Sequence, residues 1–195
     1  MMRPHEDEVL ALFRESGAML DGHFVLSSGL HSGRYLQCAL VLQHPRKAAQ
    51  LGTWLASCLR AAPVDVVIGP ALGGIIIAHE VARVLGVRAV FAERRQGVMS
   101  LRRGFRIEPF ERVALVEDVA TTGESLSELA AIVRSAGGQI VEVCAIVDRR
   151  VRDEWLLERP LFSLVRMHMP TYPATECPLC REQVPLDTPG TRQTS

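Results

Sequence analysis

The sequence predicts an α/β fold in which helices flank a central, mainly parallel β-sheet. From residue 64 to residue 147, short Val- and Ile-rich runs alternate with amphipathic stretches, as in repeated strand–helix–strand units. Glycines stand where two of the helical stretches should end, at Gly86 and Gly137. Hydrophobic residues make up 48% of the 195 residues, which is enough to build a sizeable core.

The expected elements follow in chain order. An amphipathic helix is expected at 4–16, loop followed by strand at 24–42, and a second helix at 45–59. Strands then come at 64–68, 89–91, 113–116 and 140–147, and helices at 75–85 and 125–135. Open parallel sheets bind ligands at the carboxyl ends of their strands. Functional residues are therefore expected just after Ile68, Phe91, Val116 and Val147.

The whole chain, residues 1–195, is expected to form a single domain. The segments outside the alternating region, about 1–40 and 160–187, are expected to form a small hood over the ligand site. Prolines recur from Pro160 onward, so this end is expected to be irregular, and residues 188–195 are expected to be disordered.

Charge and composition exclude several classes of protein. The 22 basic and 22 acidic residues cancel, so no overall field would attract nucleic acid, and no nucleic-acid partner is expected. No apolar run reaches the roughly 20 residues of a membrane helix, and the polar, acidic start of the chain does not resemble a signal peptide. A cytoplasmic location without a membrane partner is therefore expected. Lys47 is the only lysine, so phosphate groups would be met by arginines, hydroxyls or backbone N–H groups.

The residues that bind and act on the ligand are expected in one segment, Val113-Ala-Leu-Val-Glu-Asp-Val-Ala-Thr-Thr-Gly-Glu-Ser125. A buried strand leads here to two acids, a hydroxyl-rich turn with glycine, and the start of a helix. Free N–H groups and the helix dipole suit a phosphate monoester at such a place. The carboxylates of Glu117 and Asp118 suit a ribose diol, or Mg²⁺ held indirectly. A simple helix cap is the alternative, but the ordered combination of all four parts favours a phosphate site.

This segment resembles the phosphoribosyl pyrophosphate (PRPP) signature of type I phosphoribosyltransferases. Further segments resemble orotate phosphoribosyltransferases: a base-side segment at 22–35, a pyrophosphate loop at 68–75, a mobile loop at 91–105 and the strand end Val147-Asp-Arg149. The resemblance covers about residues 5–150. It implies a type I phosphoribosyltransferase fold and transfer of the phosphoribosyl group from PRPP to orotate, in the de novo pathway to UMP. It also implies Mg²⁺ carried by PRPP and a homodimer.

The resemblance also implies roles for individual residues. Catalytic roles fall to Glu117, Asp118, Arg94 and Arg103. The PRPP site would consist of Glu117, Asp118, Val119, Ala120, Thr121, Thr122, Gly123, Glu124, Ser125, Arg94, Leu72 and Gly73. Orotate would meet Thr121 and Arg149, whose cation suits the base's carboxylate. The alternative for Arg149 is a surface residue paired with Asp153.

Six arginines and a single acid, Glu93, lie between residues 88 and 106. The family commonly has lysines in its mobile loop and where this chain has Ser27 and Gly73, so arginines would meet the pyrophosphate here. Gly97 and Gly104 can act as hinges of a lid, and the loop is expected to serve the neighbouring subunit of the dimer. The alternative is a solvated basic surface.

Cys177-Pro-Leu-Cys180 has the spacing of a zinc knuckle but supplies two of the four ligands that zinc needs. His168 or a second subunit could complete a zinc site, and a turn with two unbound thiols is the alternative. The other cysteines, at 38, 58 and 144, lie in apolar contexts and are expected in the core.

Two other functions compete with transfer to orotate. One is a phosphoribosyltransferase for a purine or for uracil, which would not need the cation of Arg149. The other is a PRPP-sensing regulator that binds nucleic acid, which would need an added DNA-binding domain or a broad basic face. The neutral composition of the chain offers neither feature.

Overall fold

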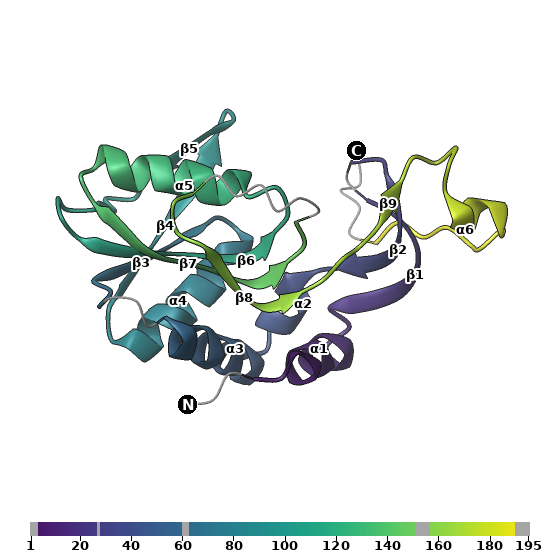
Figure 1. Ribbon diagram of the computed structural model, residues 1–195, viewed down its shortest axis with the longest axis horizontal. Helices are drawn as coiled ribbons and strands as arrows, with labels where there is room; N and C mark the ends of the chain where they lie inside the picture. Colours follow the sequence, from purple (N-terminus) through teal and green to yellow (C-terminus); the bar gives the residue numbers. More distant parts are fainter. Residues whose placement is uncertain (1–3, 27, 60–62, 151–156, 190–195) are drawn as a thin grey trace.

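The computed structural model describes residues 4–26, 28–59, 63–150 and 157–189. These residues form a main lobe and a smaller lobe that projects from one side of it (Figure 1). The main lobe contains a six-stranded sheet with helices on both faces, and the smaller lobe contains a three-stranded sheet. None of the described helices is long and apolar enough to cross a membrane.

The main sheet has the strand order β5-β4-β3-β6-β7-β8. Its strands are β3 (Val66–Pro70), β4 (Arg88–Arg95), β5 (Val98–Leu101), β6 (Arg112–Ala120), β7 (Gln139–Asp148) and β8 (Leu161–Arg166). All neighbouring strands pair in parallel except β4 and β5, which form an antiparallel hairpin at one edge. The predicted mainly parallel sheet is confirmed. Hydrophobic runs without alternation, such as the fully buried Val66–Ile68, are typical of strands covered on both faces.

Helices cover the two faces of this sheet separately. On one face lie α1 (Glu6–Glu15), α2 (Cys38–Leu42), α3 (Pro45–Cys58) and α4 (Gly73–Leu85), and on the other lies α5 (Glu124–Ser135). Strand alternation explains the division, because Ala114 and Val116 of β6 join the first core and Val113 and Leu115 join the second.

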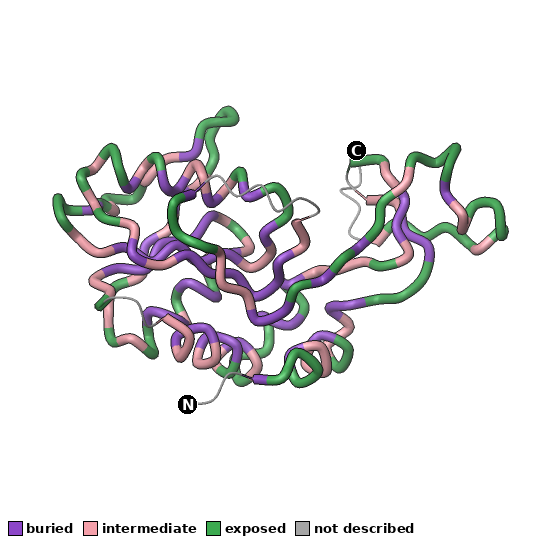
Figure 2. The backbone as a smooth tube through the Cα atoms, in the orientation of Figure 1, coloured by how far each residue is buried: buried purple, intermediate pink, exposed green. Residues whose placement is uncertain are grey.

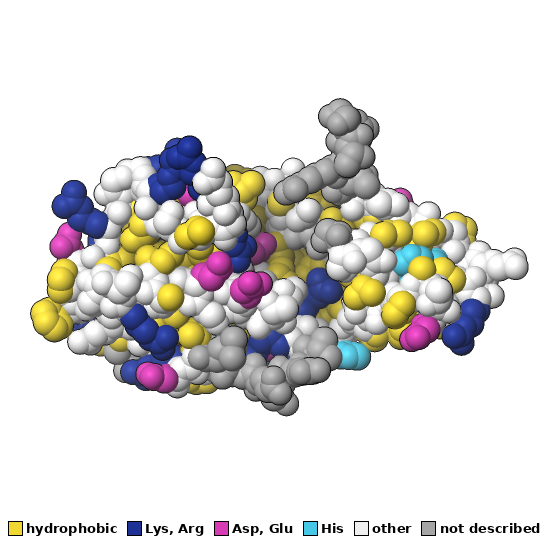
Figure 3. Space-filling view, turned by 90° about the horizontal axis from the view of Figure 1, so that it is seen from above, with side chains coloured by type: hydrophobic (Ala, Val, Ile, Leu, Met, Phe, Trp, Pro, Cys, Tyr) yellow, Lys and Arg dark blue, Asp and Glu magenta, His cyan; other side chains and the backbone are white. Residues whose placement is uncertain are grey.

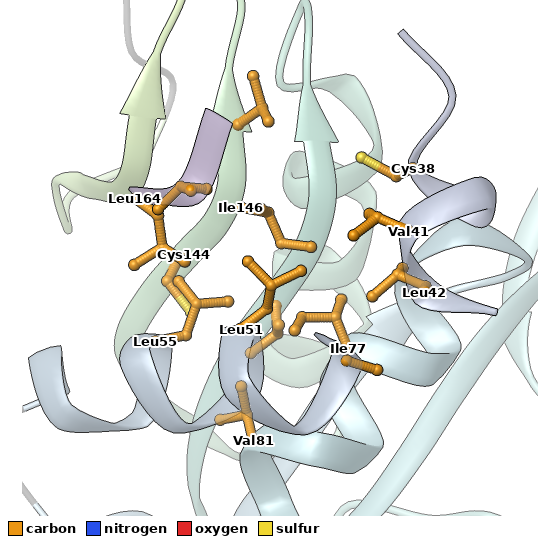
Figure 4. Close-up of a cluster of buried hydrophobic side chains, with 14 of the residues drawn as sticks. Cys38, Val41, Leu42, Leu51, Leu55, Ile77, Val81, Cys144, Ile146 and Leu164 are labelled. Carbon is orange, nitrogen blue, oxygen red and sulfur yellow. The ribbon is translucent and has the colours of Figure 1, made fainter. Parts of the chain in front are cut away.

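The first core is shown in Figure 4, where Cys38 and Cys144 lie among aliphatic side chains. Both thiols are buried, so their predicted place in the core is confirmed. Cys58, at the end of α3, is only partly buried, so the prediction for that residue was too strong.

The smaller lobe, called the hood below, consists of β1 (Met19–Val25), β2 (His31–Leu36), β9 (Thr171–Tyr172) and α6 (Pro178–Arg181). The expected bounds of the hood, 1–40 and 160–187, were too wide at both ends. Helix α1 packs on the main core through Val9 and Phe13. Residues 161–166 are not irregular but form β8, whose Leu164 and Val165 are buried in that core. The expected disorder of 188–195 falls mostly on 190–195, which lie outside the described residues.

The carboxyl ends of the parallel strands meet at one edge of the main sheet. Strand β8 runs parallel to β7, and its carboxyl end leads through residues 167–170 into β9 of the hood. The edge formed by the ends of β3, β6 and β7 therefore faces the hood (Figure 1). Figure 2 shows these central strands buried along most of their length and exposed loops at their ends.

Candidate functional site

The turn between β6 and α5 is built as an anion-binding nest. Gly123 caps the helix with φ 80°, a backbone conformation that favours glycine. The hydroxyl of Thr122 accepts the N–H of Glu124 at 3.3 Å, and the side chains of Thr121 and Thr122 are exposed. Exposed hydroxyls, the free N–H groups of the first helical turn and the helix dipole together suit a phosphate group.

Two carboxyl groups lie at the end of β6 beside this turn. Glu117 is buried, with 8% of its surface exposed, and its carboxylate accepts a hydrogen bond from Ser125. Burial raises the pKa of Glu117 to about 8, the charge of Asp118 adds to this, and Ser125 and Arg94 oppose it. Burial also raises the pKa of Asp118. Buried carboxyl groups with raised pKa values at a strand end are typical of functional sites.

The loop between β3 and α4 approaches Asp118 directly. A Cβ atom at Gly73 would overlap both carboxylate oxygens of Asp118, so a larger residue there would have to displace that side chain. The peptide bond between Ala71 and Leu72 is cis, and Leu72 is 84% exposed. The predicted pyrophosphate loop and the predicted PRPP signature therefore meet at one place, although 45 residues separate Gly73 from Asp118 in the sequence.

Arg149 follows β7 and lies beside the same edge, with its N–H donating to the carbonyl of Ala120 at 2.8 Å. Its side chain is partly buried, and its Nε has no hydrogen-bond partner among the described residues. The neighbouring Asp148 pairs instead with Arg150 at 2.8 Å. Burial lowers the pKa of Arg149, but a guanidinium stays charged in proteins. A partly buried cation with an unused donor is well placed to bind an anionic ligand.

Asp153 and Cys38 were each given a predicted place, and both bear on the surroundings of Arg149. Asp153, the alternative partner, lies outside the described residues. Cys38, expected only as a core residue, lies close enough for the charges of Asp118 and Arg149 to act on its pKa, which burial raises. Sequence reasoning missed both this proximity and the hydrogen bond from Ser125 to Glu117, because neither leaves a pattern in the sequence.

The predicted mobile loop is a β-hairpin, formed by β4 and β5 with a turn at Gln96 and Gly97. Arg94 forms an ion pair with Glu128 of α5. Arg102 and Arg103 lie 3.5 Å and 3.3 Å from carboxylate oxygens of Glu93. The segment predicted to be a mobile loop therefore has regular strand pairing, its cations are partly neutralised, and its mobility stays a prediction. Figure 3 shows basic and acidic side chains adjoining on one face of the main lobe.

The remaining predicted site residues lie near this edge of the sheet. Val119 and Ala120 are the last residues of β6 and pair with Val147 and Asp148 of β7. Glu124 is the first residue of α5. Arg103 lies over the ring of Phe91, 5.7 Å from its centroid, on the hairpin side of the sheet.

The cysteine pair lies in the hood, away from the nest. Cys177 and Cys180 meet His23 and His31, whereas His168 lines an open pocket of about 430 Å³ with residues of β2 and β9. None of the residues from Glu117 to Ser125 lines that pocket. The strand ends are the candidate site for the chemistry, because they hold the perturbed carboxyl groups and Arg149, whose Nε has no partner among the described residues.

The raised pKa of Glu117 predicts how stability depends on pH. The native state keeps a proton that the unfolded state loses above its ordinary pKa of 4.5, so stability falls as pH rises from about 4.5 to about 8. Glu117→Gln keeps the shape without the charge. Its free energy of unfolding should match wild type near pH 5 and exceed it by roughly 2–4 kcal/mol near pH 9. Denaturant titrations at several pH values measure this. The exposed Glu124→Gln is the control. If the free energy of unfolding of Glu117→Gln changed with pH in the same way as that of the wild type, the raised pKa of Glu117 would be contradicted.

Comparison with known proteins finds similar sequences and similar folds. A family model for the phosphoribosyl transferase domain matches residues 39–156. An orotate phosphoribosyltransferase of Pelotomaculum thermopropionicum is 50% identical over 194 residues, covering 96% of this chain and 98% of that protein. One of Heliobacterium modesticaldum is 49% identical over 189 residues, with coverages of 96% and 98%. The crystal structure of orotate phosphoribosyltransferase from Aeropyrum pernix superposes with a TM-score of 0.67 at 28% identity, covering 82% of this chain and 93% of that one.

Proposed function

The chain belongs to the phosphoribosyltransferase family, within it to the orotate phosphoribosyltransferases, and from this premise we propose that it makes orotidine 5′-monophosphate. It is a pentosyltransferase of pyrimidine biosynthesis that transfers the phosphoribosyl group of PRPP to orotate and releases pyrophosphate. One observation supports orotate as the base that receives the phosphoribosyl group. The partly buried Arg149, with an unpaired Nε, lies one strand away from the acidic pair. A base that bears a carboxylate needs such a cation, whereas uracil and the purines do not.

The nest and the acidic pair would bind different parts of PRPP. The 5′-phosphate would accept hydrogen bonds from the N–H groups and hydroxyls of residues 121–125. The ribose diol would donate to Glu117 and Asp118, which then favours their ionised forms. Loop residues Leu72 and Gly73 would lie along the pyrophosphate, since Gly73 packs against Asp118.

Mg²⁺ fits this donor set, because carboxylates and hydroxyls are the hard oxygen ligands that it prefers. In the proposal it arrives with PRPP, held through water or substrate oxygens by Glu117 and Asp118, and neutralises charge on the pyrophosphate. The chain's own residues then stabilise charge as the C1–O bond of PRPP breaks in an oxocarbenium-like transition state. Arg149 and Thr121 hold the orotate ring so that its nitrogen faces C1.

Arg94 and Arg103 would stabilise the departing pyrophosphate. Both form exposed ion pairs, with Glu128 and Glu93, and such pairs contribute only about 0–1 kcal/mol. Arg94 and Arg103 would therefore lose little free energy when they exchange these carboxylates for pyrophosphate. Closing the hairpin over the site would also exclude water, which protects the cationic sugar from hydrolysis.

The test is to incubate the protein with PRPP, Mg²⁺ and, separately, orotate, uracil, adenine, hypoxanthine or guanine, and to follow nucleotide formation. Transfer to orotate alone is the expected result. Transfer to another base would replace the proposal by the competing transferase function. Binding of PRPP without transfer to any base would favour the sensor.

We further propose that the protein acts in the cytoplasm as a homodimer whose β4–β5 hairpin serves the neighbouring site. The hairpin end bears Val98, which is 68% exposed, and the ion pairs of Arg94 and Arg103 on this hairpin are exposed to solvent. An isologous dimer is the commonest assembly of such proteins.

Complementation tests the shared site. A chain with Arg94→Ala and Arg103→Ala is mixed with an Asp118→Asn chain, each inactive alone. Hybrid dimers should regain activity at one of their two sites, because an intact hairpin then meets an intact pocket. Absence of recovery after demonstrated subunit exchange would mean that each hairpin serves its own chain.

Gly73→Ala should disturb the site without unfolding the protein. The added Cβ pushes the Asp118 carboxylate out of place, and a displacement of about 1 Å can reduce catalysis by about 100-fold. We expect kcat/KM for PRPP to fall by at least about tenfold, with the KM for orotate little changed. Steady-state kinetics and a melting curve measure this, and unchanged kinetics would separate Gly73 from the PRPP site.

A further inference from the structure

Four side chains in the hood point their ligand atoms at one another. They are His23 of β1, His31 of β2, and Cys177 and Cys180 at the start of α6, and their ligand atoms all lie within 4.8 Å of one another. We propose that these residues hold one zinc ion in a tetrahedral structural site. The site is separate from the transferase site and ties the C-terminal segment to the hood.

The distances fit a shared tetrahedral ion. With Zn–N near 2.0 Å and Zn–S near 2.3 Å, tetrahedral angles require about 3.3 Å between nitrogens and about 3.5 Å between nitrogen and sulfur. His23 Nε2 lies 3.0 Å from His31 Nδ1. Cys177 Sγ lies 3.4 Å and Cys180 Sγ 3.7 Å from His23 Nε2, and Cys180 Sγ lies 3.3 Å from His31 Nδ1.

The hydrogen bonding of His23 supports a metal over a set of hydrogen bonds. Its Nδ1 lies 2.9 Å from the carbonyl of Val184, a group that only accepts, so Nδ1 carries the proton and Nε2 carries a lone pair. Three groups approach that single lone pair: His31 Nδ1, Cys177 Sγ and Cys180 Sγ. A single lone pair accepts a good hydrogen bond from only one of these groups, whereas one cation can accept a lone pair from each of the four groups. A histidine that donates its second nitrogen to a backbone carbonyl is the usual arrangement at metal sites.

The ligand chemistry selects zinc. Two thiolates balance the charge of Zn²⁺, and two cysteines with two histidines form a closed structural set with no position for a substrate. Thiolate with imidazole disfavours Mg²⁺ and Ca²⁺, which prefer oxygen ligands. Cys177 is fully buried, and His23 and His31 are 3% and 6% exposed, whereas Cys180 lies on the exposed side of the group.

The fold explains how residues so far apart in the sequence meet. His31 pairs with Val25, two residues beyond His23, and the register of β1 with β2 shifts between Asp21 and Phe24, so the two imidazoles meet at an irregularity of the hairpin, 3.0 Å apart. Past α6 the chain returns to β1, where the N–H of Asp187 donates to the carbonyl of His23 at 2.8 Å. The two histidines and the two cysteines are therefore held from opposite ends of the chain.

The hood needs such a link, because its apolar interior is small. Among the described residues, buried Phe24 and Cys177 of the hood belong to neither hydrophobic core of the main lobe. Small modules with little core commonly depend on a disulfide or a metal for stability. The hairpin also carries the predicted base-side segment, so the ion would hold that segment in place.

Metal content tests the proposal directly. The full chain is produced with zinc in the medium, purified under reducing conditions without chelator, and analysed by elemental mass spectrometry. We expect one zinc per chain in the wild type and in two controls: Cys58→Ser, a thiol outside the cluster, and His168→Ala, the histidine first considered as a ligand. Cys180→Ser and His31→Gln should lose zinc, with affinity falling by more than the 10- to 100-fold that loss of an outer partner causes.

Two further measurements use only the wild type, in case the variants fail to fold. Replacing zinc by Co²⁺ should give the visible absorption of a tetrahedral ion with thiolate ligands. Removing the metal with a chelator should lower Tm by about 5–10 °C, reversed by Zn²⁺ and not by Mg²⁺. A wild type without zinc, without the Co²⁺ bands, or with Cys177 and Cys180 oxidised to a disulfide would overturn the proposal. Loss of zinc in the His168→Ala control would overturn the ligand assignment.

Discussion

Asp118→Asn should lower kcat by about 100- to 1,000-fold while the protein stays folded. Asparagine has nearly the shape of aspartate, so the packing against Gly73 should persist. It lacks the negative charge that would accept hydrogen bonds from the ribose diol and stabilise the cationic sugar in the transition state. Because burial already raises the pKa of Asp118, removing its charge should not lower stability.

Steady-state kinetics at saturating PRPP and orotate, with a melting curve at the same pH, measure this effect. Asp7→Asn, an exposed change in the first turn of α1, is the matched control and should behave as wild type. An Asp118→Asn protein with wild-type kcat would remove this carboxylate from the mechanism.

Arg149→Ala should weaken orotate binding by about ten- to a hundredfold and leave PRPP binding unchanged. A charge-assisted hydrogen bond contributes roughly 1.5–3 kcal/mol, which corresponds to that range of affinity. The change should leave stability nearly unaffected, since the Nε of Arg149 has no hydrogen-bond partner to lose within the part of the chain that the structure describes.

Binding of each ligand by calorimetry separates the two expectations. Arg46→Ala, an exposed arginine of α3, is the control for the loss of a positive charge. Equal weakening of both ligands would show that Arg149 supports the site as a whole and does not recognise the base.

The parallel sheet was predictable because each of its central strands is a continuous apolar run followed by turn residues. Val66–Ile68 and Val113–Val116 are fully buried, so no polar residue interrupts the pattern. Strand β1 was missed because its sequence, MLDGHFV, puts polar residues in the middle of a half-exposed strand. Strand β8 was missed because prolines surround it and suggested irregular structure.

The site was predictable where its parts are adjacent in the sequence. The acids, the turn and the helix start form one segment from Glu117 to Ser125, and the structure keeps them together. The sequence predicted that Gly73 and Asp118 belong to one site, but their direct packing could not be predicted, since it depends on the pairing of β3 with β6. The hairpin's ion pairs are also invisible in sequence, because Arg94 and Glu128 lie on different elements.

The zinc ligands show the same limit. The spacing of Cys177 and Cys180 identified half of a site, and His168 was the nearest histidine in sequence. The histidines that meet the pair lie far earlier in the sequence. His23 lies 154 residues before Cys177, and His31 lies 149 residues before Cys180. Only the register of the β1–β2 hairpin and the return of the C-terminal segment bring them there.

The central claim is that this edge of the sheet selects a base by its carboxylate, and one ratio tests it most directly. Uracil is orotate without that carboxylate, so kcat/KM for orotate divided by that for uracil, in wild type and in Arg149→Ala, isolates the contact between cation and carboxylate. The account predicts a large ratio in wild type that shrinks by about ten- to a hundredfold in Arg149→Ala. A ratio that is near one in wild type, or that the substitution leaves unchanged, would contradict it.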